Sequence, residues 1–507
     1  MLNRPKKLRL LLAISLMVAA GATSQAQEKF QDIQARVTEF TLNNGMKFLV
    51  LERHEAPVAS FLTYADVGSV QETKGITGLA HIFEHMAFKG TPTVGGNDYA
   101  KERVALDKVD QAFYALRDER RKGAKADPNK LKQLEEGFKR AQEEAGKYVV
   151  KNELGEAIER AGGRGLNAGT SWDSTVYFFS LPSNAMELWF SLESGRFLSP
   201  VLREFYQERD VVMEERRMRT ESQPIGKMIE EFLSVAYKAH PYGEPTVGHM
   251  SDLQNITRAD AEAFFKKYYI PSDLTAVIVG DVDPQRVRQM AETYFGRIPS
   301  SPKPEPLRTV EPPQEGERRV TLKLQSQRLM VIGYHKPDIN HPDNAVYDAI
   351  SSLLSEGRSS RLYRSLVRDK KLAVQAGGFA GLPGQKYPGL FLFFGITAPG
   401  HTNEEVEKAL DEEINRLKTE PVSKEELDGI KRRARANLIR QLDDNSQMAV
   451  QLANFQVLTG DWHNLFKQLE KIDALTPEDI KRVANATFIY NNRTVGVIEP
   501  AETTAAK

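Results

Sequence analysis

Two of the nine histidines, His81 and His85, lie four positions apart in the segment AHIFEHMAFKG, with Glu84 beside the second. On an α-helix, residues i and i+4 share one face, so both imidazoles can offer a nitrogen to the same metal ion. Glu84 projects from nearly the same face and could act as a base on water at that metal. The alternative is two helix histidines without a metal, since H-x-x-E-H arises by chance in roughly one such chain in a hundred.

A third metal ligand must come from elsewhere, because catalytic zinc usually has three protein ligands and one open position. The chain contains no cysteine, so a carboxylate is the expected third ligand. In FYQERDVVMEERRMRTE, Glu208 and Glu215 are seven residues apart and share a helix face, so one could bind the metal while the other supports the site. The sequence also permits Glu214, and an ordinary charged helix is the alternative interpretation.

The first 26 residues differ from the rest of the chain. Basic residues precede the apolar run LLLAISLMVAAGA, and Ser24-Gln25-Ala26 places small residues where a signal peptidase cleaves. Residues 1–26 are therefore predicted to be a cleaved signal peptide, with a retained signal anchor as the alternative, and no later stretch is apolar enough to span a membrane. Export without cysteines is typical of the periplasm of a Gram-negative bacterium, which is the predicted location.

Composition and charge are those of an ordinary globular protein, with 40% hydrophobic and 27% charged residues. Lysine plus arginine and aspartate plus glutamate both number 69, so no net field draws the chain toward nucleic acid or an anionic membrane. Nucleic acid is therefore not an expected partner, and any charge-driven binding has to be local.

A charged insertion separates the histidine segment from the glutamate segment. Residues 37–70 alternate as strands do, and ITGLAHIFEHMAF then takes helical spacing. Residues 99–151 combine heptad-like apolar positions with dense charge, which predicts two antiparallel helices with Pro128 at the first position of the second. We assign 101–152 as a helical-hairpin insertion, either a solvated element or a specific docking arm. Further helices are predicted at 184–197 and 205–221.

An internal repeat divides the mature chain into two halves. Residues 257–280, TRADAEAFFKKYYIPSDLTAVIVG, pair without gaps with 476–499, TPEDIKRVANATFIYNNRTVGVIE, at an offset of 219 residues. Both are typical of a capped helix, a turn and an apolar strand, and the proline-rich segment 299–318 between them is predicted to be a linker. The expected fold is α+β, with two homologous α/β sandwich domains, 27–298 and 319–507, each a mainly antiparallel sheet with packed helices.

A series of ordered segments resembles the M16 (pitrilysin) zinc metallopeptidases, and within them the short two-domain members grouped with the mitochondrial processing peptidase β subunit. The resemblance is carried by LNNGMKFLV, APVASFLTYADVGSVQE, GLAHIFEHMAFKGT, GGRGLNAGTSWDSTVYFFSLP, SGRF, ERDVVMEERR and HPYGEPTVG. It implies one Zn²⁺ per chain, held by His81, His85 and Glu215, with Glu208 as a supporting carboxylate. His85 and Glu215 are 130 positions apart, or 78 without the insertion 101–152, which is close to the spacing of the family.

The resemblance also implies the reaction and the way the substrate binds. The chain would be a zinc-dependent endopeptidase that hydrolyses peptides or unfolded polypeptide segments, with Glu84 taking a proton from water and passing it to the leaving amine. The strand after Asn167 resembles the edge to which family substrates add in extended form. Asn167, Ala168 and Thr170 are therefore candidate substrate-binding residues.

The second half departs from the family pattern at one segment. Family members use an arginine and a tyrosine from another half of the assembly to position the substrate and stabilise the oxyanion. Here LYRSLVRDKKLAVQAGG supplies Arg368 but has Val374 at the tyrosine position. The implied assembly is a heterodimer, in which an M16 homologue supplies the Arg/Tyr pair and encloses a chamber, with a homodimer using Tyr363 or another tyrosine as the alternative. A non-catalytic scaffold or binding subunit is the alternative function.

Overall fold

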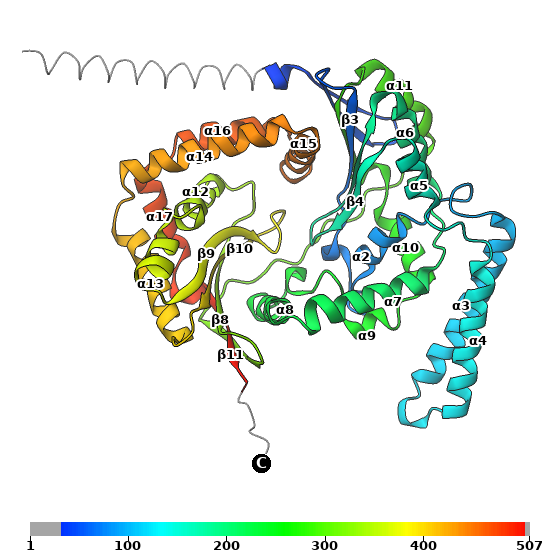
Figure 1. Cartoon of the computed structure of the whole chain (residues 1–507), viewed down its shortest axis with the longest axis horizontal. Helices are drawn as coiled ribbons and strands as arrows, with labels where there is room; N and C mark the ends of the chain where they lie inside the picture. Colours follow the sequence, from blue (N-terminus) through cyan, green and yellow to red (C-terminus); the bar gives the residue numbers. More distant parts are fainter. Residues whose placement is uncertain (1–31, 502–507) are drawn as a thin grey trace, which may run out of the picture.

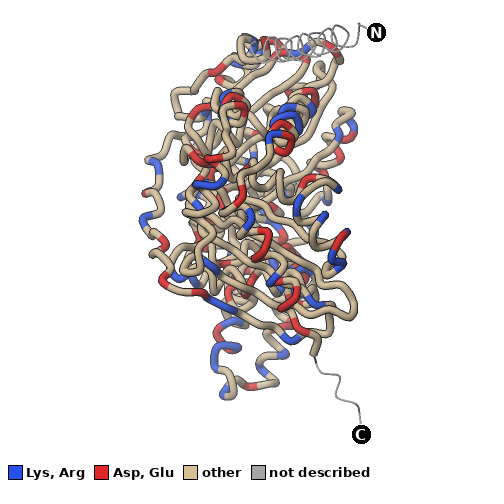
Figure 2. The backbone as a smooth tube through the Cα atoms, turned by 90° about the vertical axis from the view of Figure 1, so that its left-hand side faces the viewer, with Lys and Arg blue, Asp and Glu red and all other residues tan. Residues whose placement is uncertain are grey.

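Two α/β halves lie side by side in the computed structural model, which describes residues 32–501 (Figure 1). The predicted signal peptide, 1–26, lies outside the described residues. Within the described range, no helix combines the length and the apolar character needed to cross a membrane. Acidic and basic residues are interspersed along the backbone (Figure 2), in keeping with their equal numbers.

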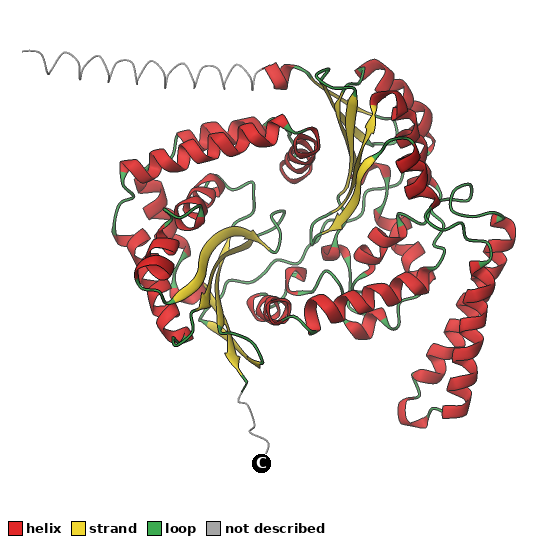
Figure 3. Ribbon diagram, viewed as in Figure 1, coloured by secondary structure: helices red, strands yellow, loops and turns green. Residues whose placement is uncertain are grey.

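The first half is built on a six-stranded sheet in the order β1-β2-β6-β3-β5-β4. Figure 3 shows its strands in yellow, with helices in red packed beside them. The pair β2 and β6 is parallel and all other neighbours are antiparallel. Alternate residues of β2 face opposite sides: Phe48 and Val50 join the core of this half, whereas Leu49 and Leu51 join a core shared with the second half. The strands are β1 Val37–Thr41, β2 Lys47–Glu52, β3 Val58–Ala65, β4 Arg164–Thr170, β5 Thr175–Pro182 and β6 Leu274–Gly280.

The helices of the first half share a hydrophobic core with one face of this sheet. The predicted helix 205–221 is divided, because α7 ends at Arg216 and a π-helical turn, Arg217–Glu221, follows it. The helices that pack here are α2 Leu79–Met86, α5 Glu153–Arg160, α6 Met186–Leu198, α7 Phe205–Arg216, α9 Met250–Leu253, α10 Arg258–Tyr268 and α11 Pro284–Tyr294.

The second half repeats this plan with a five-stranded sheet in the order β7-β11-β8-β10-β9, in which only β7 and β11 are parallel among the described strands. Its strands are β7 Arg318–Leu324, β8 Leu329–Lys336, β9 Ala373–Leu382, β10 Gly389–Thr397 and β11 Arg493–Pro500. Its helices are α12 Asn344–Ser355, α13 Asn403–Thr419, α14 Lys424–Asp443, α15 Asn445–Thr459, α16 Asn464–Asp473 and α17 Pro477–Thr487. The preceding residues 299–317 contain no helix or strand, so β7 begins at the last residue of the predicted linker.

The internal repeat is visible in the backbone. Helices α10 and α17 begin with capping boxes at Thr257 and Thr476, and both caps have φ −113° and ψ 160°. Each helix is followed by a 3-10 turn and by an interior strand of its sheet, β6 or β11. The predicted fold class, two homologous α+β domains with mainly antiparallel sheets, is confirmed.

Each half also sends one helix onto the sheet of the other half. Helix α8 (Pro224–Ala236) packs Met228 and Phe232 against the second sheet, in contact with β7 and β11. Helix α15 packs Met448 and Leu452 against β3 and β6 of the first sheet. This reciprocal packing buries the second face of both sheets and joins the halves through apolar cores.

The charged insertion is a pair of helices, α3 (Tyr99–Arg120) and α4 (Pro128–Gly146), that projects from the first half beside α7 (Figure 1). Pro128 is the first residue of α4, where its missing N–H removes no helix hydrogen bond. The Asp127 side chain caps this helix by accepting hydrogen bonds from the next two free backbone N–H groups, at 2.9 and 3.3 Å.

A buried ion pair fixes the base of this hairpin. Arg203 is 1% exposed and Glu102 is fully buried, and the guanidinium donates to both carboxylate oxygens at 2.7 and 3.0 Å. We expect Arg203→Met to lower the free energy of unfolding by about 3–5 kcal/mol, because the Glu102 carboxylate is left buried and unpaired. Urea denaturation measures this loss. The double variant Arg203→Met/Glu102→Gln should cost less than the single one, and an equal or larger cost would contradict this explanation.

Candidate metal centre

Helix α2 buries one face in the core and leaves the two histidines on the other. His81 and His85 are half-buried, and their rings meet edge to face with centroids 5.1 Å apart. The helix is held in this orientation by apolar residues of the first core: Leu79, Ala80, Ile82, Phe83 and Met86. Because residues four positions apart share a helix face, both rings lie on the same side of α2. This side faces α7, which α2 contacts.

Glu215 on α7 faces both histidines. Its Oε2 atom lies 3.6 Å from Nε2 of His81 and 3.6 Å from Nε2 of His85. One ligand atom from each residue lies within 4.8 Å of the others, and no other such group of three occurs in residues 32–501. Tetrahedral zinc ligands at about 2.0–2.1 Å from the ion are roughly 3.4 Å apart, so these three atoms fit a zinc ion with small adjustments.

Glu214, which the sequence also permitted as a ligand, points away from the histidines. Its carboxylate binds Arg217 at 2.8 Å, and its side chain is 59% exposed. The structure thus brings together His81, His85 and Glu215, the set that the resemblance implies, and leaves Glu214 at the surface.

A second carboxylate supports the histidines from behind. Glu208 lies on the same side of α7 as Glu215, and its Oε2 atom is 3.3 Å from Nδ1 of His85. Burial by itself would lower the pKa of His85, but the hydrogen bond and the charge of Glu208 outweigh burial and raise it. Burial lowers the pKa of His81, against the charge of Glu215, which favours the neutral imidazole that metal binding needs.

Glu84 lies on α2 beside His85 and is half-buried. Its charge acts on both histidines. Its side chain forms no hydrogen bond or ion pair with any described residue. An uncommitted carboxylate next to the ligand nitrogens is able to accept a proton from water bound at the same place.

The predicted substrate-binding residues divide into two groups. Asn167, Ala168 and Thr170 lie in β4, an edge strand of the first sheet that pairs only with β5 in the described chain and contacts α2. The strand begins at Arg164 and so includes Asn167, whereas the prediction placed it after Asn167. Arg368 lies in the second half, where its guanidinium binds the carboxylate of Asp369 at 2.6 and 2.9 Å, so it is not part of the group around α2.

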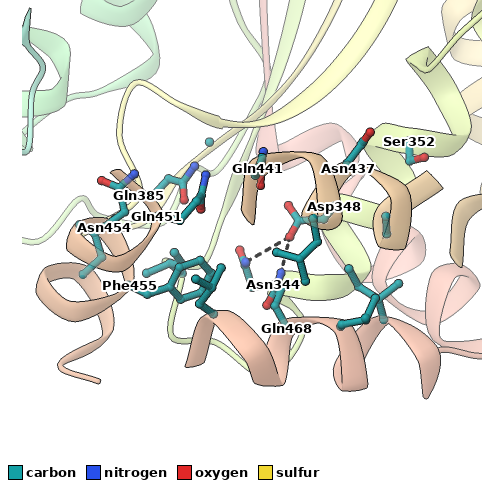
Figure 4. A pocket seen from close by; sticks show the side chains of 18 of the residues that line it. Asn344, Asp348, Ser352, Gln385, Asn437, Gln441, Gln451, Asn454, Phe455 and Gln468 are labelled. Atoms are coloured by element: carbon teal, nitrogen blue, oxygen red, sulfur yellow. Dashed lines mark hydrogen bonds between the residues drawn. The ribbon is translucent and has the colours of Figure 1, made fainter. Parts of the chain in front are cut away.

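The second half has no counterpart of the metal-binding carboxylates. Helix α14 begins 219 residues after α7, and at this offset Glu208 and Glu215 correspond to Leu427 and Ala434. Ala434 instead lines a cavity of about 590 Å³ whose walls carry many side-chain amides (Figure 4). The amides labelled there are Asn344, Gln385, Asn437, Gln441, Gln451, Asn454 and Gln468.

Sequence reasoning missed two cations that hold the acidic residues of the site. Lys89 Nζ lies 2.6 Å from Glu208 and 2.8 Å from Glu204. Arg219 donates to the Oε1 atom of Glu215 at 2.5 Å and so leaves Oε2 toward the histidines. Both cations come four residues after a site residue, His85 or Glu215, and that spacing was the available signal.

Glu72 was also missed, and it fixes the start of the histidine helix. Its buried carboxylate accepts hydrogen bonds from the backbone N–H groups of Gly78 and Ala80, both at 2.7 Å. We expect Glu72→Ala to lower the free energy of unfolding by about 2 kcal/mol, because two N–H groups at the start of α2 lose their acceptor. Zinc affinity should fall with it, as measured by competition with a chromogenic chelator. Glu72→Gln keeps one acceptor oxygen, so its free energy of unfolding should lie between those of the parent and Glu72→Ala. A Glu72→Ala protein as stable as the parent would contradict the role of Glu72 at the start of α2.

Comparisons with known proteins show which sequences and folds this chain is similar to. The family described as "Insulinase (Peptidase family M16)" matches residues 47–117, and "Peptidase M16 inactive domain" matches residues 255–434, a range that contains none of the metal-site residues. The zinc protease PqqE of Helicobacter pylori is 29% identical over 96% of this chain and 98% of its own length. The β subunit of the mitochondrial processing peptidase of Saccharomyces cerevisiae is 22% identical over 90% of this chain and 89% of its own length.

Solved structures share the whole two-domain arrangement. A protease from Helicobacter pylori superimposes with a TM-score of 0.77 at 28% identity, covering 92% of this chain and 99% of that one. A Pseudomonas fluorescens protein described as a peptidase M16 inactive domain gives a TM-score of 0.72 at 17% identity, covering 93% and 99%, which supports the fold alone. The matched segments, the relatives of similar length and the shared fold lead to one conclusion. This chain is a two-domain member of the M16 peptidase family.

Proposed function

We propose that the chain is a zinc-dependent endopeptidase that hydrolyses peptides or unfolded polypeptide segments bound in extended form. The observation that carries the proposal is the convergence of His81, His85 and Glu215, with Oε2 of Glu215 at 3.6 Å from both Nε2 atoms. Two imidazoles and one carboxylate leave a fourth position open, which is the arrangement of a catalytic zinc site. The zinc protease named among the relatives supports the same activity.

The residues around this group have separate tasks in peptide hydrolysis. When bound, zinc would supply a Lewis acid that polarises the scissile carbonyl and lowers the pKa of water. Glu84 takes the proton from the attacking water and gives it to the leaving amine. Glu208 orients the His85 ring through Nδ1, and Arg219 orients Glu215. The free edge of β4 offers backbone N–H and C=O groups to a substrate strand, which would be held next to α2.

The proposal includes a partner subunit. Val374 stands where the family has tyrosine, and Arg368 is tied to Asp369 in the second half, so this chain does not supply the Arg/Tyr pair to its own metal group. One relative is by name a subunit of a larger enzyme. We infer a heterodimer with an M16 homologue that brings this pair and closes a chamber around the substrate, with a homodimer as the alternative.

Metal analysis and peptidase assays test both parts of the proposal. The purified chain should bind one zinc per molecule, and should cleave a panel of quenched peptides only when a homologue carrying the Arg/Tyr pair is added. Full activity of the lone chain would overturn the partner requirement. Zinc binding with no cleavage in any combination would instead support a non-catalytic scaffold subunit, the second candidate, to which the match with an inactive domain points.

The proposed location is the periplasm, reached through a cleaved signal peptide. The basis is the order of basic residues, an apolar run and small residues in the first 26 positions. N-terminal sequencing of the protein from cells should begin at Gln27. A chain that still begins at Met1 would contradict cleavage.

A further inference from the structure

A cavity of about 840 Å³ lies between the hairpin α3/α4 and the side of α7 opposite the metal group. We call it the basic groove. Its walls come from α3, α4, α7 and the π-helical turn after α7, and Gln254 and Asn255, which follow α9, close it. Six cationic side chains line the groove against two acidic ones: Arg117, Arg120, Arg121, Lys139, Arg209 and Arg217, with Glu135 and Asp210. None of these residues has a role in the proposed peptidase reaction.

Positive charge exceeds negative charge in the basic groove even when every ion pair is counted. Four of the cations pair with nearby carboxylates: Arg117 with Asp118 at 3.7 Å, Arg120 with Glu135 at 2.8 Å, Arg209 with Asp210 at 2.9 Å and Arg217 with Glu214 at 2.8 Å. Arg121 and Lys139 form no ion pair anywhere in the described chain. The groove therefore keeps a surplus of two positive charges.

One of the cations, Arg209, is buried and only partly satisfied. It is 4% exposed, and its guanidinium lies over the rings of Phe113 and Tyr206 at 4.7 and 5.2 Å. Its Nε and Nη2 atoms donate to Asp210, but Nη1 has no hydrogen-bond partner among the described residues. A buried N–H without an acceptor costs free energy, so a small turn of the Arg209 side chain that brings this N–H to an anion in the groove would be favoured.

We propose that the basic groove is a binding site for a phosphate monoester, carried either by a lipid headgroup or by a free phosphate compound. A phosphate monoester carries about −1.5 to −2 charges at pH 7, which matches the surplus of two. Its oxygens suit the planar forks of several arginines at once, whereas a single carboxylate would neutralise only half of the surplus. Lys139 and Arg121 belong to the hairpin insertion, so the insertion would contribute directly to phosphate binding.

Binding of inorganic pyrophosphate to the purified full chain, measured by calorimetry at low salt, tests the proposal. The double variant Arg121→Gln/Lys139→Gln changes two exposed side chains, so the core stays intact. Its Kd for pyrophosphate should rise at least about tenfold, because charge-assisted hydrogen bonds are lost. The matched control is Arg140→Gln, an exposed neighbour of Lys139 on α4 that does not line the groove. It should bind within about twofold of the parent, and any metal chelation by pyrophosphate would be the same in all three proteins.

A second arm distinguishes the two sources of phosphate. Flotation with vesicles of phosphatidic acid, whose headgroup is a phosphate monoester, and phosphatidylcholine, compared with phosphatidylcholine alone, detects recognition of a lipid headgroup. Pyrophosphate binding that depends on Arg121 and Lys139 supports a free phosphate compound, and flotation with the same dependence supports a lipid. No binding of either probe, or equal weakening by Arg140→Gln, would overturn the proposal. Binding of polyglutamate alone with the same dependence would also overturn it and would indicate an acidic peptide.

Discussion

Glu84→Gln is expected to lower kcat/KM for peptide hydrolysis by about 10²- to 10⁴-fold while the protein keeps its zinc. The amide is nearly the same size as the carboxylate but cannot accept a proton, and general-base catalysis by one positioned group contributes an effect of this size. Because Glu84 makes no hydrogen bond to a described residue, its replacement breaks no hydrogen bond within the site. Quenched-peptide assays of the assembled enzyme measure the loss.

Zinc content and thermal stability are the controls for this variant. Both should equal those of the parent protein, since the three ligand atoms come from His81, His85 and Glu215. A Glu84→Gln protein that retained more than about a tenth of the activity would show that another group takes the proton. Loss of zinc together with activity would place Glu84 among the ligands instead.

Much of the fold follows from local sequence signals. The repeat of a capped helix and an apolar strand was readable because Thr257 and Thr476 begin capping boxes that need only residues three positions away. The packing of α8 and α15 on the sheet of the opposite half could not be predicted from the sequence. Met228 and Phe232 would be equally apolar on either sheet, and which sheet they cover depends on tertiary packing between the halves.

The site shows the same division between local and distant information. Both histidines follow from their spacing within one helix, and the family resemblance selected Glu215 over Glu214. The orienting contacts of Lys89 and Arg219 were missed because charged residues at helical spacing usually face solvent. Glu72 was missed for another reason: its partners are backbone N–H groups, which leave no trace in the identities of the residues that carry them.

The three glutamates of α7, Glu208, Glu214 and Glu215, should differ in how much they contribute to zinc binding. Glu215→Gln removes a ligand and is expected to weaken zinc binding by more than about 100-fold, whereas Glu208→Gln only releases the His85 ring and should cost about 10- to 100-fold. Glu214→Gln is the matched control, because its carboxylate is at the surface with Arg217, and should bind zinc as the parent does.

The same order should appear in the stabilisation that zinc gives to the folded state. At a zinc concentration about 100 times the Kd of the parent, binding adds about 2.7 kcal/mol to the free energy of unfolding, and this gain should fall to about 0.4 kcal/mol or less in Glu215→Gln. Thermal unfolding with and without zinc reads this out independently of any peptidase assay. Since Oε2 of Glu215 is equidistant from the two Nε2 atoms, at 3.6 Å, its loss removes the only described carboxylate that joins both histidines. A Glu214→Gln protein that lost zinc while Glu215→Gln retained it would reverse the assignment of the third ligand.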